Sequence, residues 1–406
     1  MNSRVYISLV VFLLLIGGCK EEHAVVVDFW HVMGGPLGRR LTEMIDDFNK
    51  LHPEGEVRGV HMGSYDVLAQ KLMGAIASND PPVIAQMYES WTDQFLRAGE
   101  LVPLTEFVRA EPAFNLDDFF PVFIEDNTYD TLLVTLPFNK SVPVFYYNTE
   151  LFDAYDIDSF PVDWAEFRQV CLRIREGGVW PTSWPLDVWY FSTMLYQQGG
   201  ILFDEANRKP AFNSPEGTGV IEYLTALVRD SLFYLNPGFQ RQDEFLSGNV
   251  VMIPASIVSW AFMKGKVQFE IGVAPFPQGK VQAIVIAGTN IGMFNKASRA
   301  EKELAWEFIK WFLQPENQMR WTEASYYLPT RRSVTKTEAY EKFVDDNPAY
   351  ERIVAQLDFA RTEPKTKEWF AGRIYLNDAI EEAMRLERNP RQALDDAAQR
   401  LLLELK

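Results

Sequence analysis

Apolar runs and amphipathic segments alternate through the first part of the sequence. Residues 24–30 form an apolar run typical of a buried strand, and apolar side chains recur at a helical period over residues 37–51. The same order continues with a strand over residues 56–62, a helix over 66–77 and a strand over 83–88. This β-α-β-α-β order predicts a mostly parallel sheet covered by helices on both faces, an α/β arrangement that binds ligands at the carboxyl ends of its strands.

Polar and conformationally free residues follow each of these three predicted strands. Because the carboxyl ends of parallel strands meet at one edge of a sheet, we expect these residues to gather where ligands bind. They are Trp30, His31, Gly34 and Gly35 after the first strand, Gly63, Ser64 and Tyr65 after the second, and Glu89 after the third.

The segment 136–148, Leu-Pro-Phe-Asn-Lys-Ser-Val-Pro-Val-Phe-Tyr-Tyr-Asn, is apolar, β-branched and aromatic, and it contains two prolines. Because proline is poorly tolerated in central strands, this composition favours an extended segment that passes between two lobes. In that arrangement Asn139 and Ser141 lie at the mouth of a cleft between the lobes, and ligands favour such clefts. The pattern also fits one more buried strand in a single sheet.

The rest of the chain is predicted to form the second lobe and to return to the first. The apolar run at 250–256 is interpreted as the return crossover, and strands at 272–275 and 284–294 are expected to rejoin the first lobe. A helix over 301–313, stopped by Pro315, is expected to make a third crossing. The predicted lobes consist of residues 19–138 with 257–312, and of residues 139–256 with 313–406.

The N-terminus has the pattern of an export signal. Arg4 precedes an apolar run at 5–16 that is too short to span a bilayer, and small residues then lead into Cys19. We expect residues 1–18 to be a signal peptide. The segment Ile-Gly-Gly-Cys resembles a bacterial lipobox, which implies a lipid anchor on Cys19; the alternative is a plain signal peptide with an incidental cysteine. Cys171, at helical spacing with apolar residues, is expected in the core, so no intrachain disulfide is predicted.

Charge and motif content narrow the classes of function. The formal net charge of -17 disfavours nucleic acid and anionic membrane surfaces as partners. The four histidines lie within the first 61 residues at spacings that match no zinc motif, and no P-loop, G-x-S-x-G or complete dinucleotide-binding motif is present. We therefore expect no metal, no cofactor and no enzymatic activity. An acid/base pair among the 56 carboxylates can be recognised only from coordinates.

Five motifs occur in a characteristic order along the chain. They are residues 30–38 (W-H-V-M-G-G-P-L-G), 63–66 (G-S-Y-D), 137–148 (P-F-N-K-S-V-P-V-F-Y-Y-N), 327–329 (Y-L-P) and 389–394 (N-P-R-Q-A-L). Together they resemble the family 1 extracellular solute-binding proteins of bacterial ABC importers, most closely the sn-glycerol-3-phosphate-binding branch. The resemblance implies a two-lobed, maltose-binding-like periplasmic-binding-protein fold of type II, in which each lobe is a sheet flanked by helices and three hinge crossings join the lobes.

The resemblance also nominates residues for ligand binding. Glu89 would accept hydrogen bonds from vicinal hydroxyls, and the planar fork of Arg373 would suit a phosphate or a carboxylate. Gly288 would offer a backbone amide close to the ligand, and Ser259 is an equally spaced rival of Ser256. The nominated ligand-binding residues are Tyr65, Glu89, Ser141, Ser256, Gly288, Tyr327 and Arg373.

Each nominated side chain also has an ordinary structural explanation. The tyrosines fit half-buried aromatic positions, Glu89 fits a helix cap, and Arg373 fits a surface ion pair. Lys140 replaces a small polar residue of the family pattern, where it either assists an anionic ligand or points to solvent. Three tryptophans fit either stacking on sugar rings or burial in the core: they are Trp184, Trp189 and Trp260.

The resemblance implies a lipid-anchored substrate-binding protein on the periplasmic or extracytoplasmic face, which closes on a small solute and delivers it to a permease in the inner membrane. Arg373 favours a glycerol-3-phosphate-type phosphoester, and the tryptophans favour a neutral mono- or oligosaccharide. A polysaccharide-acting lipoprotein enzyme and a ligand sensor remain as alternatives. The protein is expected to act as a monomer.

Overall fold

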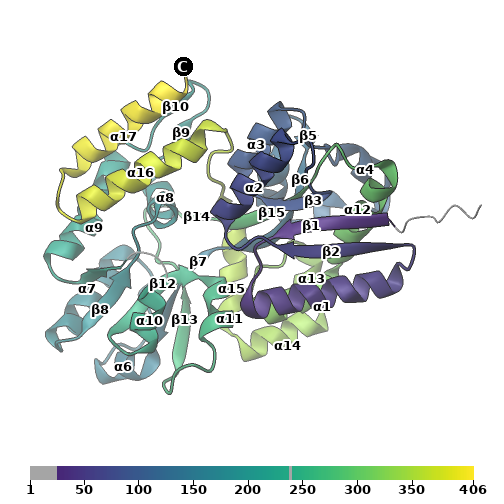
Figure 1. Cartoon of the computed structure of the whole chain (residues 1–406). Helices are drawn as coiled ribbons and strands as arrows, with labels where there is room; N and C mark the ends of the chain where they lie inside the picture. Colours follow the sequence, from purple (N-terminus) through teal and green to yellow (C-terminus); the bar gives the residue numbers. More distant parts are fainter. Residues whose placement is uncertain (1–24, 237–239) are drawn as a thin grey trace, which may run out of the picture.

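The computed structural model describes residues 25–236 and 240–406, which contain two five-stranded sheets in two halves that lie side by side (Figure 1). The strand order is β2-β1-β3-β15-β6 in the first sheet and β11-β8-β12-β7-β13 in the second. Helices flank both sheets, which confirms the predicted two-lobed α/β fold. The predicted signal peptide 1–18 and the predicted lipid site Cys19 lie outside the described residues.

The first sheet begins with the parallel β-α-β-α-β order that the hydrophobic pattern predicted. β1 (Val25–His31) pairs in parallel with β2 (Gly55–His61) and with β3 (Ile84–Met87). β15 (Ala287–Met293) runs antiparallel between β3 and β6 (Thr135–Ser141). The helices of this half are α1 (Gly35–Leu51), α2 (Tyr65–Ala77), α3 (Glu89–Arg97), α4 (Thr105–Ala110), α5 (Pro121–Asn127), α12 (Arg299–Phe312), α13 (Pro315–Ser325) and α14 (Glu338–Asp346).

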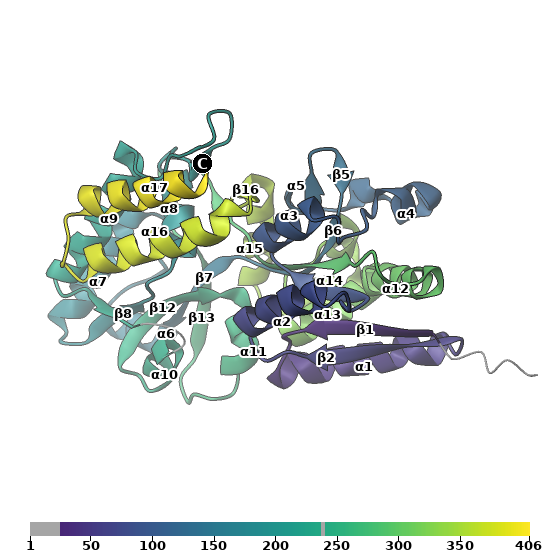
Figure 2. The same cartoon turned by 45° about the horizontal axis from the view of Figure 1, so that its top comes forward.

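The second sheet combines parallel and antiparallel pairs. Its strands are β7 (Pro143–Asn148), β8 (Trp180–Trp184), β11 (Phe233–Leu235), β12 (Val250–Ser256) and β13 (Ile271–Pro275). Its helices are α6 (Thr149–Ala154), α7 (Trp164–Glu176), α8 (Val188–Gln197), α9 (Pro215–Arg229), α10 (Gln240–Leu246), α16 (Glu368–Met384) and α17 (Pro390–Glu404). α16 and α17 lie side by side and pack on α8 and α9 (Figure 2). The short helices α11 (Trp260–Met263) and α15 (Ala349–Ala355) lie where the two halves meet.

Short elements complete the described chain. Three two-stranded pairs are β4 (Thr128–Tyr129) with β5 (Leu132–Leu133), β9 (Phe203–Asp204) with β10 (Lys209–Pro210), and β14 (Ile284–Val285) with β16 (Ala360–Arg361). The 3-10 helices are η1 (Pro112–Phe114), η2 (Leu116–Asp118), η3 (Ile257–Ser259), η4 (Arg332–Lys336) and η5 (Gln356–Phe359). Among the described residues, no helix combines the length and the apolar composition needed to cross a bilayer.

The first crossing between the halves lies where the sequence predicted it. β6 belongs to the first sheet and β7 to the second, and only Val142 separates the two strands. Val142 is fully buried, and Phe138 and Phe145 on either side pack into the two halves against Phe29 and Phe276, at ring-centroid distances of 5.3 Å in both pairs. The alternative of one continuous strand in a single sheet is therefore wrong.

The structure corrects the other two predicted crossings. The strand expected at 272–275 to rejoin the first lobe is β13, which pairs with β7 in the second sheet, so the return to the first sheet follows β13. The helix expected at 301–313 makes no crossing, because α12 packs on β1 and α13 packs on α1 within the first half. The chain crosses later, through α15 and β16, and β16 pairs in parallel with β14 on the other returning segment. A local apolar pattern shows that a face is buried but does not show which sheet buries it.

Candidate functional site

Asn139 on β6 connects several polar side chains at the edge of the first sheet. Its Nδ2 donates to the Tyr327 hydroxyl at 2.8 Å and to the Tyr65 hydroxyl at 3.2 Å. Its Oδ1 accepts from the Thr289 backbone nitrogen at 3.0 Å and from Gln86 Nε2 at 3.3 Å. Asn139 itself is fully buried, so this network holds the two phenols in a fixed arrangement.

Local structure explains why the two tyrosines reach this point. Tyr65 is the first residue of α2, directly after Ser64, whose hydroxyl accepts from the Val67 backbone nitrogen as a helix cap. Tyr327 follows the end of α13, and its ring stacks on Trp321 at 5.8 Å between ring centroids. The first tyrosine is half-buried and the second is buried.

A buried group of charges lies beside this network. Lys140 Nζ is 2.6 Å from Asp126 Oδ2 and 3.3 Å from Glu89 Oε1. Asn290 Nδ2 donates to the same two oxygens, at 3.0 Å and 3.2 Å. We call Lys140, Asp126, Glu89 and Asn290 the Lys140 cluster. The lysine side chain is fully buried, whereas the Glu89 side chain keeps 16% of its exposure at the first turn of α3.

The environment of the Lys140 cluster changes its proton affinities. Burial raises the pKa of Glu89 to about 8, the neighbouring Asp126 adds to this, and Lys140 acts in the opposite direction. Burial by itself would lower the pKa of Lys140. The two neighbouring carboxyl groups act more strongly in the opposite direction, so the net pKa of Lys140 lies above its ordinary value. Glu89 can therefore hold a proton near neutral pH, so its partly exposed carboxyl can either donate or accept a hydrogen bond.

A second charged group belongs to the other half of the molecule. Arg373 on α16 donates through Nε to Glu363 Oε2 at 3.1 Å and through Nη2 to Asp187 Oδ1 at 3.0 Å. Its side chain is 44% exposed. Burial by itself would lower the pKa of Arg373. The negative charges of Glu363 and Asp187 act more strongly in the opposite direction, so the net pKa of Arg373 is raised. We call Arg373, Glu363 and Asp187 the Arg373 cluster.

Contacts between α3 and α16 bring the Arg373 cluster close to the first sheet. The backbone nitrogen of Lys367, just before α16, donates to Asp93 Oδ2 on α3 at 2.9 Å. Burial raises the pKa of Tyr88 well above its ordinary value, Tyr65 adds to this, and the charge of Arg373 acts in the opposite direction. Tyr88 in turn packs on Tyr65 at 4.9 Å between ring centroids. Phenols, a carboxyl and a guanidinium from both halves therefore form one candidate binding site.

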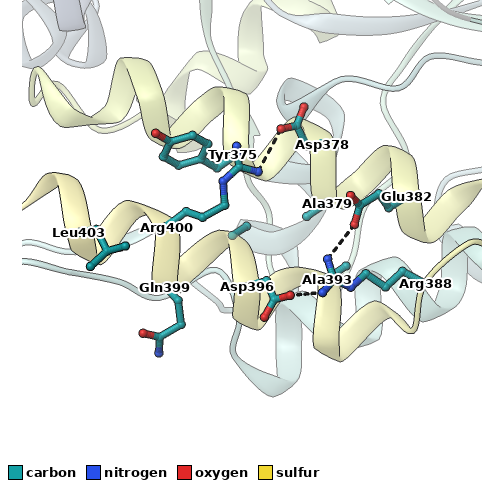
Figure 3. A pocket seen from close by; sticks show the side chains of 11 residues that line it. Tyr375, Asp378, Ala379, Glu382, Arg388, Ala393, Asp396, Gln399, Arg400 and Leu403 are labelled. Carbon is teal, nitrogen blue, oxygen red and sulfur yellow. Dashed lines mark hydrogen bonds and ion pairs between the residues drawn. The ribbon is translucent and has the colours of Figure 1, made fainter.

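Two surface cavities lie away from this site. A cavity of about 310 Å³ runs between α16 and α17, where Arg400 pairs with Asp378 and Arg388 pairs with Glu382 (Figure 3). A cavity of about 250 Å³ lies beside β13 and α15. Within the described residues, neither wall includes a nominated ligand-binding side chain.

Comparison with known proteins identifies the family. Residues 43–351 match the model of a family described as bacterial extracellular solute-binding protein, which is more than half of the chain. The chain belongs to this family. Its members are transport proteins that bind solutes, in agreement with the expectation from the sequence motifs.

Individual relatives of this solute-binding protein are distant but span nearly its whole length. The sn-glycerol-3-phosphate-binding periplasmic protein UgpB of Pectobacterium atrosepticum is 24% identical, over 98% of this chain and 94% of that protein. The structure of UgpB from Mycobacterium tuberculosis in complex with glycerophosphocholine has a TM-score of 0.84 at 22% identity, covering 93% of this chain and 97% of that one. The cyclic alpha-maltosyl-1,6-maltose binding protein of Arthrobacter globiformis has a TM-score of 0.82 at 25% identity, covering 94% and 99%. The fold is the maltose-binding-like fold that the motifs implied.

The solute-binding protein gathers only some of the nominated residues through side-chain contacts. Tyr65 and Tyr327 meet at Asn139, Glu89 lies in the Lys140 cluster, and Arg373 contacts Glu363 and Asp187 in the other half. Ser141 ends β6 and is buried, and within the described chain its hydroxyl forms no hydrogen bond with protein. This hydroxyl therefore remains able to bind another group.

The serines at the end of β12 have local partners. The Ser256 hydroxyl accepts from the Val258 backbone nitrogen at 3.3 Å and caps η3. The Ser259 hydroxyl accepts from Gln242 Nε2 at 2.9 Å. Both hydroxyls therefore accept a hydrogen bond within the protein. These contacts do not show which of the two serines contacts a ligand.

Gly288 is required by packing between strands. Its φ is +101°, and a Cβ atom at this position would lie 1.7 Å from the Asn139 carbonyl oxygen on β6. The glycine is therefore needed for the close approach of β15 to β6, and the contact of its backbone amide with a ligand stays a prediction.

The three tryptophans occupy different environments. Trp184 is 1% exposed and stacks on Phe233 at 4.5 Å between ring centroids, so the hypothesis that it stacks on a sugar is replaced by a core role. Trp189 is buried, and its indole nitrogen donates to the Val285 carbonyl at 2.7 Å. Trp260 is half-buried and lies parallel to Tyr146. Of the three tryptophans, Trp260 is the one that is not fully buried.

Sequence reasoning missed two members of each charged cluster. Asp126 and Asn290 complete the Lys140 cluster, and Asp187 and Glu363 complete the Arg373 cluster. Asp187 is separated from Arg373 by 186 positions, and its one sequence signal, a capping position before α8, indicates structure and not a site. Lys140 itself neither points to solvent nor stands free to meet an anion.

Proposed function

We propose that this protein is the substrate-binding component of an ABC importer, which captures a small hydroxyl-rich solute at the candidate site and delivers it to a membrane permease. The observation that carries this proposal is that Tyr65 and Tyr327 meet at Asn139 in the first half, and that α16, which carries Arg373, is joined to α3, which begins at Glu89, by the bond from Lys367 to Asp93. A solute held between them contacts both halves at once.

The chemistry of the site suits a polyol. Phenol hydroxyls, the Ser141 hydroxyl and the partly exposed Glu89 carboxyl provide both donors and acceptors, as vicinal hydroxyls require. The half-buried ring of Trp260 provides an apolar face near the same junction of the halves. Sugars and glycerol phosphates share this hydroxyl chemistry, and the names of the relatives include proteins for both classes.

The mechanism is closure of a hinge. Val142, the segment with β14 and the segment with β16 connect the halves, and we propose that these three segments absorb the rotation between the lobes. The lobes are then the two sheets with their own helices, in place of the boundaries at 256 and 312 that the sequence suggested. The solute stabilises the closed form only by the difference between its affinities for the closed and open forms.

The proposal extends to cellular context. The lipobox-like pattern at Cys19 supports export, a lipid anchor and a place on the extracytoplasmic or periplasmic face of the membrane. The protein acts as a monomer without cofactor or catalytic step. Neither of the two alternatives, a polysaccharide-acting enzyme and a ligand sensor, gains a specific supporting observation.

A thermal-shift screen tests the proposed function. The purified protein is heated with maltose, glucose, maltotriose, glycerol-3-phosphate or glycerophosphocholine, because binding to the native state raises the melting temperature by mass action. A concentration-dependent shift with at least one solute, lost in a Tyr65→Ala variant, is the expected result. Conversion of an oligosaccharide to smaller products in the same samples would support an enzyme instead.

A further inference from the structure

We infer that Asp187 and Glu363 decide which charge of solute the site accepts: by neutralising Arg373, they select neutral hydroxylated solutes over phosphoesters. The inference rests on the proposed function and names the substrate class of that site. The cation concerned is Arg373, which the sequence analysis nominated as a binding group for a phosphate.

The geometry of Arg373 leaves little of its fork for a phosphate. Glu363 binds Nε, with its two oxygens at 3.1 Å and 3.4 Å, and Asp187 binds Nη2 at 3.0 Å. Nε and Nη2 together form the side edge of the guanidinium, one of the edges that binds a carboxylate or phosphate in a bidentate manner. That edge is already occupied by two different carboxylates.

The charge count points the same way. One guanidinium and two carboxylates give the Arg373 cluster a net charge of -1. A phosphomonoester carries about two negative charges near neutral pH, so it meets net repulsion at this cluster unless it displaces an acidic side chain. A neutral polyol meets no such repulsion and can accept from the remaining guanidinium N–H groups.

The other cation of the site offers no compensation. Lys140 is bound by Asp126 and Glu89, and its side chain is fully buried. Both cations are therefore already paired: Lys140 with the Asp126 carboxylate and the Glu89 carboxyl, and Arg373 with two carboxylates. An anionic solute gains no unpaired positive charge from either.

The two acidic side chains near Arg373 are held in place by further contacts. Asp187 Oδ1 accepts from the Trp189 backbone nitrogen at 2.9 Å and caps α8. Glu363 Oε2 accepts from Trp369 Nε1 at 2.8 Å. A solute phosphate would have to compete with side chains that are already fixed. Both accepting contacts survive in an amide, so Asp187→Asn and Glu363→Gln remove charge while keeping the local structure.

The test compares binding of glycerol-3-phosphate and of maltose by isothermal titration calorimetry in the wild type and in the Asp187→Asn/Glu363→Gln variant. We expect the double variant to bind glycerol-3-phosphate at least about tenfold more tightly than the wild type, with maltose affinity changed by less than about threefold. Adding Arg373→Gln should abolish the gain. Asp378→Asn, on the same helix but paired with Arg400, is the matched control and should change neither affinity.

Three outcomes are informative. The inference is supported if the double variant binds glycerol-3-phosphate more tightly than the wild type and this gain requires Arg373. If the wild type binds neither probe, the gain still supports the inference, and only the proposed function is in doubt. A double variant with no gain overturns the inference. Glycerol-3-phosphate binding to the wild type more tightly than maltose also overturns it, while the proposed function stands.

Discussion

The Nδ2 atom of Asn139 lies 2.8 Å from the hydroxyl oxygen of Tyr327, which joins a strand of the first sheet to the segment after α13. The two residues are 188 positions apart, and the same nitrogen also holds Tyr65. A single buried amide thus positions two of the phenols that we assign to solute binding.

Replacing this amide should weaken both the fold and the site. We expect Asn139→Ala to lower the free energy of unfolding by about 2–4 kcal/mol, because Thr289, Gln86 and Tyr327 lose a buried partner. Urea unfolding followed by circular dichroism measures the loss. Asn207→Ala, in an exposed loop, is the control and should change stability by less than about 0.5 kcal/mol. Equal stability of the two variants would contradict the role of Asn139.

Gly288 should tolerate no side chain. Gly288→Ala places a Cβ 1.7 Å from the Asn139 carbonyl oxygen at a φ of +101°, so we expect a loss of more than about 3 kcal/mol or failure to fold. Gly74→Ala, inside α2 with nothing within 4 Å of the added Cβ, should instead stabilise by about 0.5–1 kcal/mol. Thermal melts of both variants check this pair. A Gly288→Ala protein as stable as the wild type would mean that β6 and β15 are farther apart than described.

Glu89 should make stability depend on pH. Its folded pKa is raised to about 8, above the unfolded value, so its contribution is greatest below the unfolded pKa and is lost as pH rises through the folded pKa. Between about pH 5 and 9 we expect the wild type to lose stability relative to Glu89→Gln, by at most about 5 kcal/mol. Chemical unfolding at several pH values measures the difference. Glu323→Gln, on the exposed side of α13, should follow the wild-type profile, and a parallel profile for Glu89→Gln would reject the assigned shift.

The tryptophans should separate stability from binding. Trp184→Ala removes a ring that is 1% exposed, and we expect a loss of about 3–5 kcal/mol in the free energy of unfolding. Trp260→Ala removes a half-buried ring, so its loss of stability should be smaller, while its affinity for a bound sugar should fall about tenfold. Calorimetric titration and urea unfolding of both variants give the comparison. Unchanged sugar affinity in Trp260→Ala would remove this ring from the site.

Residues 25–87 and the first crossing show how much the sequence predicts. The periods of apolar side chains predicted β1, α1, β2, α2 and β3 in order, and the two prolines of the segment 136–148 predicted the passage between the halves. Tyr65 and Glu89 followed from their positions after predicted strands. These features depend on backbone geometry that repeats every few residues, and this repeat produces a periodic pattern of apolar side chains in the local sequence.

The sequence by itself therefore determined the family, the order of the early elements and several members of the site. Only the tertiary structure decided that β13 joins the second sheet, that Lys140 is buried between Asp126 and Glu89, and that Asp187 and Glu363 occupy Arg373. The physical reason is that a strand's partner and the neighbours of a charge depend on how distant segments pack. Asp187 and Arg373 meet across 186 positions, and no periodicity of the chain records that contact.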